Sequence, residues 1–122
     1  MTRAGYSSVD QYRSLRQILV KIEAELKWLE LWEAEPPPPA ALASALPFCY
    51  DTLGLHQWLQ WRFLPKMHRI LLGHGSLPAE SAIFPYALDC FRESEQDSNE
   101  LLFLLRSFDE LLSGKEDGSI PQ

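Results

Sequence analysis

Apolar residues recur at every third or fourth position along most of this chain, and this spacing constrains the fold more than any other feature. The clearest stripe comprises Tyr12, Leu15, Leu19, Ile22, Leu26, Leu29 and Trp32. Steps of three and four residues keep side chains on one face of an α-helix. No stretch alternates apolar and polar residues for long enough to form a strand. The sequence therefore predicts an all-α fold.

Four consecutive prolines, Pro36–Pro39, end the first predicted helix, which we place at residues 8–34. Proline has no backbone N–H, and the residue before a proline avoids helical angles. The run is either a ligand for a proline-binding module or a stiff connector between helices. We favour a Pro-rich connector over residues 35–47, because no flanking arginine completes a docking signal.

The second predicted helix, residues 53–72, is apolar around most of its circumference, which is typical of a central helix. Gly73 is expected to end it, since glycine is common just after a helix. Pro65 lies inside this helix and removes the hydrogen bond to the carbonyl of Trp61, at a cost of about 3 kcal/mol. A kink or break at Pro65 is therefore predicted.

Two shorter helices complete the predicted fold. One runs over residues 85–94, with Pro85 as its first residue. The other follows Asp97 and Glu100, which are spaced like a capping box. Its buried stripe comprises Leu101, Leu104, Leu105, Phe108, Leu111 and Leu112. With 122 residues, we expect a single domain, a bundle of about four helices, with loose ends at residues 1–7 and 115–122.

Composition excludes several classes of protein. The chain has 11 Lys and Arg against 17 Asp and Glu, a net charge of -6, which argues against indiscriminate coating of DNA or RNA. No apolar run approaches the ~20 residues of a membrane span, so no membrane partner is expected. The N-terminal segment lacks the apolar centre of a secretory signal, so we interpret Cys49 and Cys90 as reduced thiols of a cytoplasmic protein.

The central helix concentrates positive charge. Arg62, Lys66 and Arg69 form one row, with Trp58 beside them. This row is either a surface for an RNA backbone or an acidic protein, or it pairs internally with Asp and Glu of the first and last helices. We favour internal pairing, with Trp58 in the core.

The four tryptophans provide a second candidate contact. Most of them are expected in the core, because tryptophan buries a large apolar area. Trp32, next to the prolines, is expected to be partly exposed. It is either an anchor for a protein partner or a ring that stacks on proline to close the end of the bundle.

Cys49 is the one candidate nucleophile. A thiolate close to a helix N-terminus can be stabilised, but catalysis also requires His56, His68 or His74 within reach. The alternative is a buried packing cysteine, and we assign Cys90 to the core. No His, Cys or carboxylate spacing indicates a metal site, and we expect neither a metal nor a cofactor. The pair Asp109 and Glu110 is interpreted as a solvated face.

One stretch resembles a known family. The residues that carry the likeness are Pro47, Phe48, Cys49, Asp51, Thr52, Trp58, Trp61, Pro65, Lys66, Met67, His68, Pro85 and Tyr86. They resemble the signature of the YqcC-like family of small bacterial proteins. Gly54 departs from this pattern, which affects where the second helix starts. The resemblance implies a compact helical bundle, and it implies a structural role for the signature residues. Members of that family have no established activity and are often encoded beside a tRNA pseudouridine synthase, which implies an accessory role in tRNA modification.

The sequence thus predicts a non-catalytic interaction or accessory protein. Its expected partner is a tRNA pseudouridine synthase or a second copy of the chain. Two alternatives remain open: a small thiol-dependent enzyme that uses Cys49, and a module that contacts tRNA through Arg62, Lys66 and Arg69.

Overall fold

A computed structural model describes residues 8–73, 75–94 and 97–113, and this part of the chain contains helices and no strand. Four helices have eight or more residues: α1 (Ser8–Trp28), α4 (Leu64–Leu71), α5 (Ile83–Cys90) and α6 (Asn99–Leu112). Short turns of helix lie between α1 and α4: α2 (Pro39–Leu42), the 3-10 turn η1 (Pro47–Cys49), α3 (Leu55–Trp58) and the π-helical turn η2 (Leu59–Phe63). The predicted all-α fold is confirmed, and the predicted loose ends lie outside the described residues.

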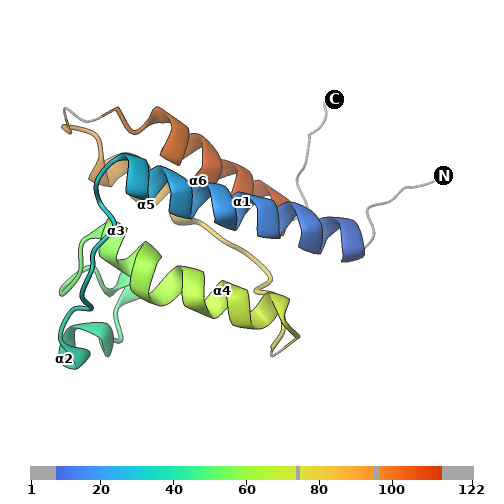
Figure 1. The fold of residues 1–122 in the computed structure, drawn as a ribbon, viewed down its shortest axis with the longest axis horizontal. Helices are drawn as coiled ribbons and strands as arrows, with labels where there is room; N and C mark the ends of the chain where they lie inside the picture. The colour runs from blue at the N-terminus through green and yellow to red at the C-terminus, as the bar shows by residue number, and fades with distance from the viewer. Residues whose placement is uncertain (1–7, 74, 95–96, 114–122) are drawn as a thin grey trace.

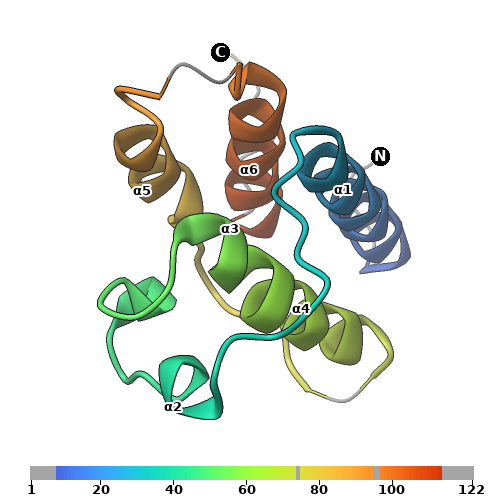
Figure 2. The same ribbon diagram turned by 60° about the vertical axis from the view of Figure 1, so that its left-hand side comes forward.

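Helices α1 and α6 lie side by side and run in opposite directions, while α5 packs against α6 (Figure 1). The continuous segment α3–η2–α4 crosses this pair on one side, and the chain that contains α2 and η1 forms an outer excursion (Figure 2). The core lies where these elements meet, and its most deeply buried side chains include Leu19, Leu59 and Phe108. The leucines and isoleucine of the first predicted stripe and the whole stripe of α6 are buried as expected, whereas Tyr12 and Trp32 are only partly buried.

Helix α1 ends at Trp28, six residues before its predicted end. Glu30 has a left-handed backbone (φ 63°), its N–H bonds the carbonyl of Lys27 (3.0 Å), and the Leu31 N–H bonds that of Leu26 (2.9 Å). These two bonds form a Schellman motif, a common helix end. The helix therefore stops before the prolines are reached, and the predicted range 8–34 was too long. Trp28 points outward with 75% of its surface exposed, against the expectation of a core residue.

The central helix runs from Leu55 to Leu71 and contains a π turn just before Pro65, the residue at which the sequence predicts a kink or break. The Leu64 N–H bonds the carbonyl of Leu59, five residues back, and Pro65 follows directly. The departure from α-helical bonding thus precedes the proline and includes one extra residue in the turn. At the far end, Gly73 adopts φ 96° and donates to the carbonyl of Ile70 (3.0 Å), which confirms glycine as the stop.

Helix α5 begins two residues earlier than predicted, so Pro85 is its third residue rather than its first. The amide groups of Ile83 and Phe84 at its start bond the carboxylate of Asp109 on α6. Asp109 is buried, which corrects its interpretation as part of a solvated face. At the start of α6, Asp97 accepts a hydrogen bond from the Asn99 N–H (3.2 Å). No helix in the described ranges is both long and apolar enough to cross a bilayer.

Candidate docking pocket

A pocket of about 260 Å³ opens between η1, the central helix, the segment before α5, and α6. Its base consists of buried apolar side chains: Phe63, Met67, Ile83, Phe108 and Leu112. Phe48 and Trp58 form one wall, and both are half-buried. The charged side chains at its rim are Arg62, Lys66 and Glu80. Four parts of the chain that are distant in sequence thus build one apolar hollow with a mainly cationic rim.

The aromatic wall is locked by ring contacts. Trp58 meets Phe48 edge-on (centroids 4.9 Å apart) and stacks on Phe63 (5.4 Å), which in turn meets Phe108 edge-on (4.9 Å). On its other side, Phe48 stacks on Tyr86 with centroids 4.5 Å apart. Such pairs add about 0.5–1.5 kcal/mol each beyond the area that they bury. The wall is therefore preorganised.

Phe48 and Cys49 both have a left-handed backbone, with φ 57° and φ 49°. This conformation costs a residue other than glycine roughly 1–2 kcal/mol. The Cys49 carbonyl accepts bonds from the Thr52 and Leu53 N–H groups, and its side chain is 1% exposed. Two strained residues in succession hold the Phe48 ring against Trp58, and strain of this kind occurs at ligand clamps.

Within the described part of the chain, the basic row forms no internal ion pairs, against expectation. Arg62 donates to the carbonyl of Leu42, and its Nη1 lies 3.5 Å from Cys49 Sγ, so this side chain ties the connector to the central helix. Lys66 and Arg69 are exposed, and neither forms an ion pair with any residue that the structure describes. Residues 55–72 contain no Asp or Glu. The exposed face of the central helix therefore keeps its positive charge although the chain is acidic.

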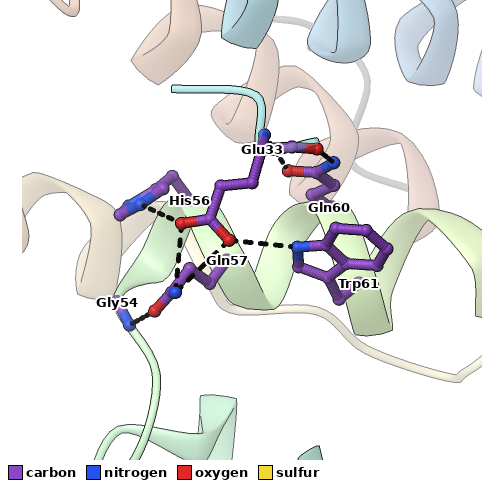
Figure 3. A network of polar contacts seen from close by, with 6 residues as sticks. All are labelled: Glu33, Gly54, His56, Gln57, Gln60 and Trp61. Atoms are coloured by element: carbon purple, nitrogen blue, oxygen red, sulfur yellow. Dashed lines mark hydrogen bonds and ion pairs between the residues drawn. The ribbon is translucent and has the colours of Figure 1, made fainter. Parts of the chain in front are cut away.

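Glu33 anchors the other side of this helix (Figure 3). Its carboxylate accepts hydrogen bonds from Gln57 Nε2 (3.1 Å) and Trp61 Nε1 (3.3 Å) and lies 3.6 Å from His56 Nε2. Its backbone N–H and carbonyl both bond the Gln60 amide at 2.8 Å. These contacts fix the rotation of α3–η2 about its axis, and that rotation sets where Trp58 and Arg62 point.

A second hollow, of about 630 Å³, lies between α1 and α6 beside the exposed Trp28. Burial raises the pKa of Glu25 in this hollow above its usual value, and the carboxylates of Glu100 and Asp97 raise it further.

Behind the aromatic wall, burial also raises the pKa of Tyr86, to about 12, with a hydrogen bond to Cys90 as the next cause.

The structure gathers three of the predicted binding residues, Trp58, Arg62 and Lys66, around the pocket. Arg69 does not line it. Trp32 lies apart, half-buried, with Lys27 Nζ 5.1 Å from its ring centroid. This placement fits the expectation that Trp32 is partly exposed.

The candidate nucleophile is buried, and several signature residues form hydrogen bonds that hold the fold. The Cys49 thiol is buried beside Arg62 and the carbonyl of Ser44, whereas Cys90 is exposed, against expectation. His56 lies by Glu33, His68 is exposed, and His74 is outside the described residues.

Asp51 accepts from Ser44 Oγ, and Thr52 donates to the carbonyl of Ala41 (2.7 Å), so both hold the loop that follows α2. Of the remaining signature residues, Pro47 opens η1, and Pro65 is exposed at the surface of the central helix. No group of three or more His, Cys, Asp or Glu residues in the described ranges is arranged to hold a metal ion.

Sequence reasoning missed the far side of the pocket. Pro78 and residues 80–83 line it because Asp109 accepts from Ser81 Oγ and from the Ile83 N–H (3.1 Å), which draws this segment onto α6. Asp109 lies next to a stripe of leucines, and a single sequence then suggests that its carboxylate is exposed to solvent. The one signal in the sequence is that Ala82, directly before this helix, is not a capping residue. The free N–H groups at the start of the helix therefore need a partner from elsewhere in the chain.

Comparison with known proteins shows the family. The model of the family described as "DUF446: tRNA pseudouridine synthase C" matches residues 14–111. A Haemophilus influenzae protein, itself described as uncharacterized, is 34% identical over 101 residues, which are 83% of this chain and 94% of that protein. A protein of Pectobacterium carotovorum named tRNA pseudouridine synthase C is 42% identical over 64 residues, 52% of this chain but 17% of its own length.

The fold has a solved counterpart. The solution NMR structure of YqcC from Escherichia coli superposes with a TM-score of 0.74 and 28% identity, and the match covers 92% of this chain and 94% of that one. The predicted resemblance is thereby confirmed on both sequence and fold. The chain belongs to the DUF446 family, and it is related to YqcC of Escherichia coli.

Proposed function

We propose that this protein is a non-catalytic accessory module that docks onto a tRNA pseudouridine synthase. One observation carries the proposal: a relative named tRNA pseudouridine synthase C contains a segment 42% identical to half of this chain. That segment is 17% of the relative's length. Most of that protein therefore lies outside the match, with room for a separate catalytic domain.

Joining two modules in one polypeptide makes their contact intramolecular, at effective concentrations in the millimolar range for short linkers. A module that is made as a separate chain must achieve the same association through its own surface. The pocket beside Trp58 is suited to this role, because protein-binding hot spots combine buried aromatic contacts with arginine and a charged rim.

The proposal is tested by mixing this protein with the purified tRNA pseudouridine synthase C of its own organism and measuring binding by calorimetry. We expect a saturable one-to-one complex with a Kd in the micromolar range or tighter. A second pseudouridine synthase from the same cell, with a different tRNA target, is the control and should not bind. Absence of a complex with either synthase, with or without tRNA, contradicts the proposal.

A second candidate function is direct contact with the tRNA backbone. Lys66 and Arg69 favour it, because both are exposed and unpaired in the described ranges and no acidic residue lies among residues 55–72. Binding through phosphates weakens steeply with salt. If this candidate is correct, Lys66→Glu and Arg69→Glu should weaken tRNA binding equally, and a salt titration should show the counterion release.

A further inference from the structure

We propose that the pocket beside Trp58 receives one apolar side chain from an acidic segment of a protein partner. This inference rests on the proposed docking function and identifies the surface that performs it. The pocket holds about 260 Å³, room for one large side chain, between the wall formed by Phe48 and Trp58 and a base that includes Met67.

The chemistry of the base selects an apolar occupant. Phe63, Met67 and Phe108 offer no hydrogen-bonding groups, and the one lining hydroxyl, that of Ser81, already donates to Asp109. A nucleobase placed against these side chains would find hydrogen-bonding partners only at the wall and rim, and each polar atom left without one would cost about 1–3 kcal/mol. An aliphatic or aromatic side chain has no such cost. Methionine beside aromatic rings is also common in surfaces that accept apolar anchors.

The rim selects the charge of the segment that carries this side chain. Lys66 is exposed and free of ion pairs within the described residues, and Arg62 lies next to it. Glu80 is the one acidic residue of the rim, so the rim has a net positive charge. Opposite charges on the partner would face these cations, which favours an acidic segment. The strained backbone of Phe48 fits the same function, because it holds one wall in place before the partner arrives.

Three capped peptides probe the pocket: one with a central phenylalanine between aspartates, one with alanine in place of phenylalanine, and one with lysines in place of the aspartates. Binding is followed on the full chain through the indole N–H signals in an NMR titration. Trp58 lies in the pocket wall, whereas Trp28 lines the separate hollow between α1 and α6 and serves as the internal reference. We expect the first peptide to shift the Trp58 signal saturably and the other two to leave it unchanged.

Two pairs of variants locate the contact. Ala82→Trp adds bulk at a lining position, and Ala79→Trp adds the same bulk three residues away, at an exposed position outside the pocket. Lys66→Glu reverses a charge on the rim, and Arg69→Glu makes the same reversal on the same helix outside the rim. We expect Ala82→Trp to weaken the first peptide at least ~10-fold and Lys66→Glu to weaken it about 3–10-fold at low salt. The two controls should remain within about 2-fold of the parent.

Several results would overturn the inference: equal binding of the alanine peptide, no effect of Ala82→Trp, or equal losses from Lys66→Glu and Arg69→Glu. If Lys66→Glu and Arg69→Glu weaken the peptide equally and also weaken tRNA binding, the surface would be assigned to an RNA backbone instead. The synthase titration, repeated with the same variants, separates this inference from the proposed function. If the synthase binds the parent and Ala82→Trp alike, docking stands and the pocket assignment fails. If the peptide binds as expected and the synthase does not bind, the pocket stands and the choice of partner fails.

Discussion

The carboxylate of Asp109, near the end of α6, accepts a 2.7 Å hydrogen bond from the backbone N–H of Phe84, at the start of α5. The same carboxylate accepts from the Ile83 N–H, and the third residue of α5 is Pro85, which has no N–H to satisfy. One buried side chain thus serves both free amide donors at the start of a helix that has no cap of its own. The negative charge also lies favourably at the helix N-terminus.

Asp109→Asn keeps the shape of this contact and removes its charge. We expect a loss of about 2–3 kcal/mol in the free energy of unfolding, because buried hydrogen bonds to a charged group are replaced by weaker ones. Urea denaturation followed by circular dichroism measures it. Glu110→Gln is the control: it breaks only the exposed pair with Arg106 and should change stability by less than ~0.5 kcal/mol. Equal effects of the two substitutions would show that Asp109 is not a cap.

Glu33→Ala removes the carboxylate that receives Gln57 and Trp61. We expect a loss of about 1–2 kcal/mol in the free energy of unfolding, because two donors lose their partner. The indole N–H signal of Trp61 should move with it in the NMR spectrum. Glu35→Ala, two residues away at an exposed position, should leave both quantities unchanged. A Trp61 signal that does not respond to Glu33→Ala would contradict the hydrogen bond.

Glu25→Gln tests the carboxylate cluster between α1 and α6. The pKa of Glu25 is raised in the folded protein, so its ionisation opposes folding, and this penalty appears as the pH rises through the carboxylate range. The variant should therefore be more stable than the parent at pH 7, and the difference should vanish below the unfolded-state pKa. Thermal melts at neutral and acidic pH measure this. A gain of the same size at both pH values would point to a cause other than charge.

The two thiols should differ sharply in reactivity. Cys90 is exposed and Cys49 is 1% exposed, so a disulfide reagent such as DTNB should modify one thiol rapidly and the second at a rate limited by opening of the structure. Cys90→Ser should remove the fast phase. A fast phase that remains in Cys90→Ser and disappears in Cys49→Ser would show that Cys49 is the reactive thiol. That result would favour the alternative of a thiol-dependent enzyme.

How far the sequence predicts this fold depends on whether a feature is local. The stripe of Leu15, Leu19 and Ile22 and the stop at Gly73 follow from periodicity and backbone preference, and both are found as predicted. The end of α1 was missed because a non-glycine residue, Glu30, occupies the left-handed position of its Schellman motif. The outward direction of Trp28 was missed because most tryptophans were expected in the core, and a sequence does not show which flank of a helix a neighbouring helix covers.

The candidate site was predicted only in part, for a related reason. Trp58, Arg62 and Lys66 lie within nine residues of one helix, so their proximity was visible in the sequence. The other half of the pocket depends on Asp109 reaching back 25 and more residues to hold the start of α5. Internal ion pairs of the basic row are not found among the described residues. Arg62 instead contacts a backbone carbonyl and a sulfur, which charge counting does not consider.

The π turn over Leu59–Phe63 sets how the two halves of the central helix are rotated relative to each other. A π turn is equivalent to an α-helical segment with one residue inserted. If the same residues formed a regular α-helix instead, the part of the helix after the turn would be rotated relative to Trp58, because each α-helical residue turns the chain by about 100°. Lys66 and Met67 would then leave the pocket that Trp58 and Arg62 line. The length of this turn, more than the identity of any one of its residues, therefore sets which side chains of the two halves of the helix share a face.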